Sequence, residues 1–145
     1  MPKVYLASDH AGFALKQALI PYIGTLGHAA EDMGAHEEVS GDDYPDYVLP
    51  CAERVAAEAG SFGIVIGGSG QGEAMAANRV RGARAAVFYG GNPEIPQLAR
   101  EHNDANILSL GARFASEEEA KEAVRAFLAT PFSGEERHAR RLGKF

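Results

Sequence analysis

Short apolar runs alternate with helical patterns along the whole chain, and this alternation is the feature that most constrains its fold. Five runs are expected to be strands: residues 4–7, 28–32, 63–66, 83–89 and 107–110. Strands that alternate with helices form a mostly parallel sheet with helices on both faces. The sequence therefore predicts a single α/β domain over residues 1–145, with three α/β/α layers around a doubly wound, five-stranded parallel sheet.

Apolar residues at helical spacing predict the helices that connect these strands. The expected helices cover 11–26, about 48–56, 73–80, 93–102, a segment that starts at 116, and 133–142. Pro21 lies inside the first helix and is expected to bend or shorten it. Two capping boxes, Ser116 with Glu119 and Ser133 with Glu136, are predicted to start the last two helices.

Charge and composition disfavour several classes of partner. The 145 residues carry a formal net charge of −6, which disfavours nucleic acid and anionic membranes but leaves a small anionic substrate open. Cys51 is the one cysteine, so no disulfide can form within the chain. No apolar run approaches the ~18 residues of a membrane-spanning helix, and the first residues lack a secretory leader pattern. We therefore expect a cytoplasmic protein.

Ligands of such sheets bind beyond the carboxyl ends of the strands, which here points to three places. They are the segments 8–10 and 67–72 and the turn after Tyr89. The richest is Gly67-Gly68-Ser69-Gly70-Gln71-Gly72-Glu73, in which glycines let main-chain N–H groups converge on an anion. A tight turn alone would explain a single glycine, whereas four glycines and a serine favour a function. The segment matches neither the dinucleotide-binding fingerprint nor a P-loop.

Three further groups of residues are candidates for chemistry. Glu73 follows the glycine loop and is either a complement to the helix dipole or a general base beside an anion site. Asp9 and His10 follow the first strand, where Asp9 is also a natural N-cap. The segment from His102 to Asp104 ends a helix before the fifth strand, so topology does not show whether His102 approaches the site.

The last helix carries a basic cluster that suits a phosphate. Arg137 and Arg141 are four residues apart on one face, and a guanidinium binds phosphate in a bidentate way. The alternative is a solvated basic surface that pairs with neighbouring glutamates. Arg113, after the fifth strand, is a third candidate. The five histidines and Cys51 lack metal-ligand spacing, so no metal site is expected, and Gly68-Ser69-Gly70 is not a hydrolase elbow.

Six motifs together resemble the type B ribose-5-phosphate isomerases, whose wider family includes galactose-6-phosphate and allose-6-phosphate isomerases. They are Ser8-Asp9-His10-Ala11-Gly12, Asp43-Tyr44-Pro45, the segment from Gly67 to Glu73, Ala76-Ala77-Asn78, Arg100-Glu101-His102-Asn103 and Arg137-His138-x-Arg140-Arg141. They occur in order over essentially the whole chain, and their combination is specific. The resemblance implies a Rossmann-like fold and a homo-oligomer, dimer or tetramer, whose sites are shared between two chains without metal or other cofactor.

The resemblance also implies roles for individual residues. Glu73 would be the base, Ser69 would assist it, and Asp9 and His102 would help to open the sugar ring. Substrate-binding residues would be His10, Tyr44, Gly68, Gly70, Gln71, Gly72, Asn103, Arg113, Arg137 and Arg141. Many members have a cysteine as base where this chain has Gly67, so the chain resembles the branch in which the glutamate takes over.

The implied function is an aldose–ketose isomerase that interconverts ribose 5-phosphate and ribulose 5-phosphate through a cis-enediolate, in the pentose phosphate pathway. The same chemistry on allose 6-phosphate, galactose 6-phosphate or a tetrulose phosphate stays open, because no residue of the sequence measures chain length. A non-catalytic sugar-phosphate sensor is a further alternative, and the presence of Glu73 and His102 argues against it because binding alone needs no base. The missing fingerprint disfavours a nucleotide-binding domain.

Overall fold

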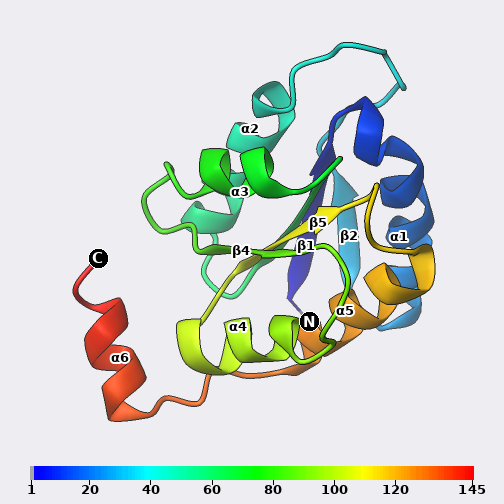
Figure 1. Cartoon of the computed structure of the whole chain (residues 1–145). Coiled ribbons are helices and arrows are strands. Elements are labelled where there is room, and N and C mark those ends of the chain that lie inside the picture. The colour runs from blue at the N-terminus through cyan, green and yellow to red at the C-terminus, as the bar shows by residue number, and fades with distance from the viewer. Residues whose placement is uncertain (1) are drawn as a thin grey trace.

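The computed structural model describes residues 2–145, which form a five-stranded parallel sheet between two layers of helices (Figure 1). The strands are β1 (Lys3–Ser8), β2 (Ala29–Asp32), β3 (Phe62–Gly67), β4 (Ala85–Phe88) and β5 (Ile107–Gly111). Their order in the sheet is β2-β1-β3-β5-β4, and every neighbouring pair is parallel. The predicted doubly wound α/β fold and its five strands are confirmed.

Helices cover both faces of this sheet. One face is covered by α1 (Phe13–Thr25), α4 (Ile95–Asn103) and α5 (Glu117–Ala129), and the other by α2 (Pro45–Ala57) and α3 (Gln71–Ala77). A 3-10 turn, η1 (His10–Gly12), precedes α1, and α6 (Glu136–Leu142) lies beside α4 at the side of the domain (Figure 1). No helix among residues 2–145 has both the length and the apolar character needed to span a membrane.

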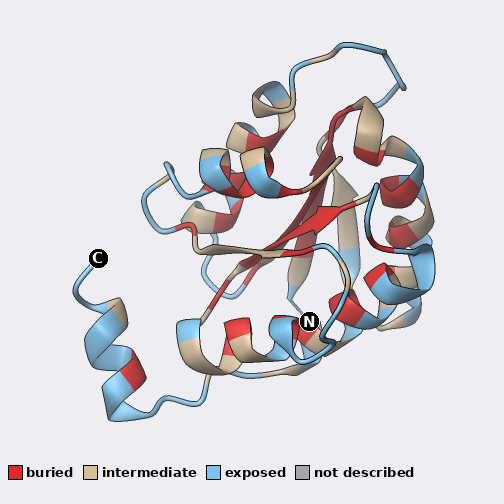
Figure 2. Ribbon diagram, viewed as in Figure 1, coloured by how far each residue is buried: buried red, intermediate tan, exposed pale blue. Residues whose placement is uncertain are grey.

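The core lies on both faces of the central strands (Figure 2). Along β1, Val4 and Leu6 pack toward α1, α4 and α5, whereas Tyr5 and Ala7 pack toward α2 and α3. This division follows because successive side chains of a strand point to opposite faces. The central strands β3 and β5 are buried almost throughout, as expected for parallel strands with helices on both sides.

Of the two capping boxes predicted at helix starts, one is confirmed and one is wrong. The capping box of Ser116 and Glu119 is confirmed at the start of α5. The second capping box is wrong, because α6 begins at Glu136 with Glu135 as its N-cap and no side-chain cap bond. The Ser133 hydroxyl instead accepts a hydrogen bond from Glu135 N, within the linker that precedes the helix.

Other boundaries shift by a few residues. Helix α3 begins at Gln71, so Glu73 lies inside its first turn rather than at its first position. Strand β4 is shorter than the predicted 83–89. Helix α1 continues through Pro21 to Thr25, so the proline does not end it.

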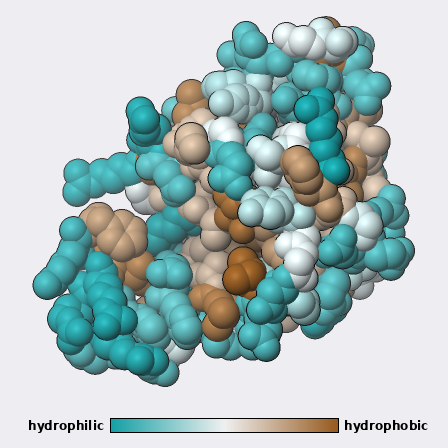
Figure 3. Space-filling view, viewed as in Figure 1, coloured by the Kyte–Doolittle hydropathy of each residue, from teal (hydrophilic) through white to brown (hydrophobic). Residues whose placement is uncertain are grey.

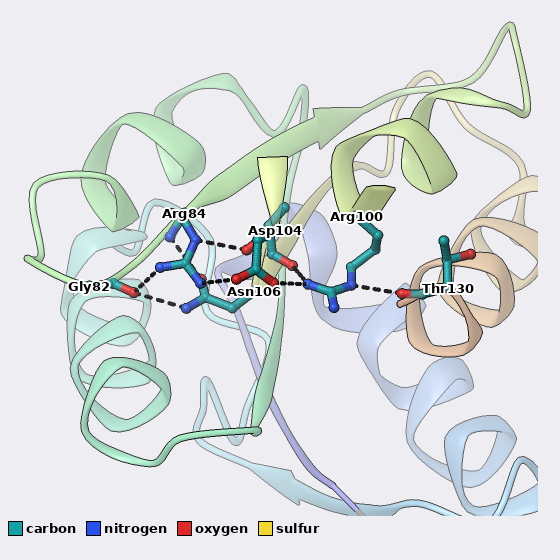
Figure 4. A network of polar contacts seen from close by, with 7 residues as sticks. Gly82, Arg84, Arg100, Asp104, Asn106 and Thr130 are labelled. Carbon is teal, nitrogen blue, oxygen red and sulfur yellow. Dashed lines mark hydrogen bonds and ion pairs between the residues drawn. The ribbon is translucent and has the colours of Figure 1, made fainter. Parts of the chain in front are cut away.

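A polar network fixes the turn between α4 and β5, at the amino edge of the sheet (Figure 4). Asp104 ends α4 with a φ of 45°, and its two carboxylate oxygens contact Arg100 at 3.0 Å and Arg84 at 3.4 Å. Arg100 is buried, and its Nε also donates to the carbonyl of Thr130 at the end of α5. The network therefore holds the end of α4 and the start of the linker to α6 in one place.

A buried ion pair ties α1 to the segment after β2. Lys16 is fully buried, and its Nζ donates to Asp32 Oδ1 at 2.6 Å and to the carbonyl of Ala35. Ala35 N in turn donates to the carbonyl of Ser8, the last residue of β1, at 2.8 Å. The ion pair thus helps to position the carboxyl end of β1, where Asp9 follows.

Asp32→Ala is expected to lower the free energy of unfolding by about 3–5 kcal/mol, because it leaves the Lys16 ammonium buried without its counter-charge. Burial alone would raise the pKa of Asp32, but hydrogen bonds from Lys16 and Gly34 outweigh burial and lower this pKa below its ordinary 3.8. A carboxylate with a depressed pKa stabilises the fold above its ordinary pKa and loses this effect as the pH falls through the folded value. The difference between parent and variant should therefore shrink below pH 3.8.

Urea unfolding at several pH values measures this difference. The matched control is Glu31→Ala, whose ion pair with Lys3 is partly exposed on both sides and should contribute less than about 1 kcal/mol. Equal losses in the two variants at neutral pH would contradict the role of the buried pair.

Candidate active site

A glycine loop joins the carboxyl end of β3 to the start of α3. Gly70 is the N-cap of α3 and has a φ of 80°, in the left-handed region that favours glycine. Three hydrogen bonds from β5 and the residues after it fix the loop. They run from Ser109 Oγ to Gly70 O at 2.7 Å, from Ala112 N to Gly67 O at 2.8 Å and from Arg113 N to Gly68 O at 3.0 Å.

The Glu73 carboxylate lies directly over Gly67. Its side chain leaves the first turn of α3 and is 5% exposed. A methyl group added at Gly67 would overlap all three atoms of this carboxyl group, which therefore occupies the space of the missing side chain. Burial raises the pKa of Glu73, and the Asp9 carboxylate adds to this rise, although a main-chain hydrogen bond acts in the opposite direction.

Asp9 and His10 follow the end of β1, next to the end of β3. Asp9 Oδ1 accepts hydrogen bonds from Ala11 N at 3.0 Å and Gly12 N at 3.3 Å, so the expected N-cap role is confirmed. Gly12 packs so closely on β3 that an added methyl group would lie 2.6 Å from the carbonyl oxygen of Ile66. This contact brings the two polar turns after β1 and β3 together, as the topology rule predicts.

The order of the sheet decides which other turns join them. Because β5 lies between β3 and β4, the turn with Arg113 adjoins the glycine loop, and the turn after Tyr89 lies one strand further away. An atom of the Arg113 guanidinium lies 3.1 Å from the position of an added methyl group at Gly68. The hydroxyl oxygen of Tyr44, just before α2, lies even closer to the position of an added methyl group at Gly72.

Asp42 is a neighbour of the site that sequence reasoning missed. Asp9, His10 and Asp42 each offer a ligand atom, and these atoms lie within 4.8 Å of one another. His10 Nδ1 and Asp42 Oδ1 are 2.7 Å apart and share a hydrogen bond, while Asp9 Oδ1 serves the N-cap. All three residues are therefore already engaged in hydrogen bonds within the protein. Ser109 was also missed, although a polar residue in an otherwise apolar strand could have indicated that its hydroxyl group bonds to the glycine loop.

His102 and Asn103 lie at the other edge of the sheet. They end α4, just before the start of β5, whereas Glu73 follows the carboxyl end of β3. β3 and β5 are parallel neighbours, so these two edges are separated by the length of β5. Its five residues span roughly 16 Å at a rise of ~3.3 Å per residue. A single chain therefore does not bring His102 and Asn103 next to Glu73.

The basic helix α6 also belongs to this amino edge. The ring of His138 stacks on that of His102, with centroids 4.4 Å apart and an interplanar angle of 17°. Arg137 and Arg141 are exposed, and Arg137 pairs with Glu135, as the solvated alternative expects. Hydrophilic residues cover α6 on the face seen in Figure 3. The two arginines thus lie with His102 and apart from the glycine loop.

Comparison with known proteins decides the family. A model of the Ribose/Galactose Isomerase family matches residues 4–145. This chain belongs to the ribose/galactose isomerase family. The resemblance carried by the six motifs is therefore confirmed. A member named ribose-5-phosphate isomerase B, from Mycolicibacterium paratuberculosis, is 47% identical over 140 residues, which cover 97% of this chain and 87% of that protein.

Solved structures of the ribose/galactose isomerase family share the fold. A ribose-5-phosphate isomerase B of Mycoplasma genitalium with bound ribulose-5-phosphate has a TM-score of 0.93 at 36% identity, covering 98% of this chain and 92% of that one. A ribose 5-phosphate isomerase of Thermotoga maritima has a TM-score of 0.91 at 43% identity, covering 99% and 96%. Both likenesses span almost the whole of each chain.

Gly67→Ala is expected to cost about 1–3 kcal/mol of stability, because the new methyl group and the Glu73 carboxylate need the same space. In a Glu73→Ala background the same substitution should cost far less, since the space is then vacant. Urea unfolding of the parent, both single variants and the double variant should give a coupling energy of about 0.5–3 kcal/mol.

The matched control is Gly24→Ala in α1, where an added methyl group meets no atom within 4 Å. This change should be neutral or stabilising, because alanine favours a helix over glycine. An identical cost of Gly67→Ala with and without Glu73 would show that the two groups do not compete for space.

Proposed function

We propose that this chain is an aldose–ketose isomerase that interconverts ribose 5-phosphate and ribulose 5-phosphate, with Glu73 as its base. The observation that carries the proposal is the buried Glu73 carboxylate held over Gly67, beside the glycine loop. Membership of the family supports the reaction class, and relatives named ribose-5-phosphate isomerase B support the substrate. The Mycoplasma genitalium structure with ribulose-5-phosphate favours a five-carbon sugar over allose 6-phosphate, galactose 6-phosphate or a tetrulose phosphate.

The chemistry requires two groups that meet in this loop. Isomerisation moves a proton from C2 of the aldose to C1 of the ketose through a cis-enediolate. Because the C2–H is a very weak acid, the reaction needs both a base and hydrogen-bond donors for the enediolate oxygen. Glu73 is the base, and main-chain N–H groups of Gly68–Gly72, together with Ser69, are the donors. One such donor typically contributes about 10²–10³ in rate.

Burial prepares Glu73 for this role. Its raised pKa makes the carboxylate a stronger base while leaving it deprotonated at higher pH. In family members with a cysteine base, that cysteine stands at the position of Gly67, and here the Glu73 carboxylate fills the same space. Cys51 cannot replace it, because this residue lies within α2 and burial raises the pKa of its thiol to about 12.

A second copy of the chain completes the site. Ribose 5-phosphate is much shorter than the roughly 16 Å between the two sheet edges, so one molecule cannot contact Glu73 and His102 of the same chain. A symmetric dimer resolves this, because it can place the amino edge of one chain against the carboxyl edge of the other. Asp9 and the partner's His102 then open the furanose ring by acid–base catalysis, and the partner's Asn103 contacts the sugar.

The phosphate is bound at the junction of the two chains. Arg113 comes from the chain that supplies Glu73, and Arg137 and Arg141 come from the exposed α6 of the partner. Their contacts at the phosphate orient the reacting carbons, since binding energy remote from the reaction can position the reacting end. The pentose phosphate pathway in the cytoplasm is the setting that we propose for this reaction.

Glu73→Gln keeps the size of the side chain but removes the base, so kcat is expected to fall by about 10²–10⁴-fold with little change in KM. In the parent, kcat/KM should fall as the pH drops through the raised pKa of Glu73, above its ordinary 4.5, because only the carboxylate accepts a proton. Ribulose 5-phosphate formation, followed from pH 5 to pH 9, measures both effects.

Unfolding of the variant provides the control. A carboxyl group whose pKa is raised by folding destabilises the fold once the pH exceeds that pKa, so Glu73→Gln should be at least as stable as the parent at neutral pH. A folded Glu73→Gln protein with near-parental turnover would contradict the assignment of the base.

Shared sites predict that two inactive variants complement one another. Glu73→Gln and His102→Asn chains are unfolded, mixed in equal amounts and refolded together. If each site takes Glu73 from one chain and His102 from the other, half of the dimers carry one intact site, and about a quarter of parental activity returns.

The control mixture combines Glu73→Gln with Asp9→Asn, two changes at the same sheet edge. Each site of its mixed dimers still contains one of the changes, so activity should stay at the level of the separate variants. Failure of the first mixture to regain activity, although mixed dimers form, would contradict a site shared between chains.

A further inference from the structure

Asp42 and His10 make a two-point contact beside the candidate active site. The main-chain N–H of His10 donates to Asp42 Oδ1 at 3.0 Å, and the ring Nδ1 lies 2.7 Å from the same oxygen. The two residues are 32 positions apart, so the contact joins the end of β1 to the loop before α2. The proposed isomerisation does not by itself account for this contact.

We propose that Asp42 is a positioning residue that fixes the ring of His10 and the proton on its Nδ1, so that Nε2 is the nitrogen presented to the substrate. A carboxylate accepts hydrogen bonds and a neutral imidazole carries a single N–H, so the contact requires the proton on Nδ1. Nε2 of the neutral ring is then an acceptor for a hydroxyl group of the sugar. The inference rests on the proposed function only for the identity of this ligand.

Burial makes Asp42 a fixed partner for the ring. Only 9% of its side chain is exposed, against 30% for His10. Asp42 Oδ2 is buried and accepts no hydrogen bond from residues 2–145, so the carboxylate has His10 as its polar partner. Burial alone would raise the pKa of Asp42, but the hydrogen bonds from the main chain and ring of His10 outweigh it and lower this pKa. The carboxylate therefore stays ionised and remains an acceptor.

The two bonds also restrict the rotation of the ring. One bond fixes the carboxylate relative to the backbone of His10, and the other fixes Nδ1 relative to the carboxylate. The imidazole is the more exposed half of the pair, and its neighbour Asp9 belongs to the candidate site, where the Asp9 carboxylate also acts on Glu73. A role limited to anchoring the loop before α2 would not depend on which ring nitrogen carries the proton, and this separates the two explanations experimentally.

The first test measures the tautomer directly, without substrate. Long-range ¹H–¹⁵N correlation spectra of ¹⁵N-labelled protein are recorded at a pH well above the ordinary histidine pKa of about 6.5. The parent should show a protonated Nδ1 and an unprotonated Nε2 at His10. Asp42→Ala should shift the ring toward the Nε2–H form. Asp42→Asn should keep the parental pattern, because its amide oxygen still accepts both bonds.

Glu38→Gln is the matched control, since it removes an exposed carboxylate from the same loop and should leave the His10 signals unchanged. An Nε2–H tautomer in the parent, or an unchanged tautomer in Asp42→Ala, would overturn the proposal. Because these spectra need no turnover, they remain decisive if the protein is not a ribose-5-phosphate isomerase.

The second test measures the consequence for the site. Asp42→Ala should lower kcat/KM for ribose 5-phosphate by about 10-fold or more, since small displacements of a substrate-binding group reduce rates strongly. Asp42→Asn should restore most of this loss. In a His10→Ala background Asp42→Ala should have little further effect, because the ring that it positions is absent. The same fold-loss in both backgrounds would show that Asp42 does not act through His10.

Discussion

The Glu73 carboxylate occupies the space that a side chain at Gly67 would need, and the candidate active site depends on this steric constraint. Any side chain at Gly67 would drive the carboxylate away from the glycine loop. A cysteine base at this position and a glutamate base from the first turn of α3 are thus sterically exclusive solutions. Burial at this place raises the pKa of the Glu73 carboxyl group, which suits the role of base that we propose for it.

Parallel topology divides the remaining candidate site residues between two edges of one sheet. Strand ends place Asp9, Glu73 and Arg113 at the carboxyl edge, while the end of α4 places His102 at the amino edge. A different set of hydrogen bonds holds each edge in place. Main-chain hydrogen bonds from β5 hold the glycine loop, and the network around Asp104 holds the end of α4 and the linker to α6. The chain therefore carries two groups of candidate site residues, one at each edge of the sheet.

The features that could be predicted from the sequence are those that depend on residues close together along the chain. Apolar periodicity located the strands, and the caps at Asp9 and Ser116 follow from local hydrogen bonding. The same pattern at Ser133 failed because that residue is held in a linker, where its N–H bonds to the carbonyl of Glu101. The position of β5 between β3 and β4 depends on contacts between residues far apart in the sequence, which the pattern of apolar residues within each strand does not reveal. In the sequence, Asp42 could not be distinguished from the other acidic residues of its loop, because its partner His10 lies 32 positions away.

A crystal structure of this protein with ribulose 5-phosphate bound would test directly whether Glu73 is the base. We expect a carboxylate oxygen of Glu73 within about 3–3.5 Å of C1 and C2, with the enediolate oxygen facing the glycine loop. A bound sugar whose C1 and C2 lie out of reach of Glu73 in every side-chain rotamer would contradict this role.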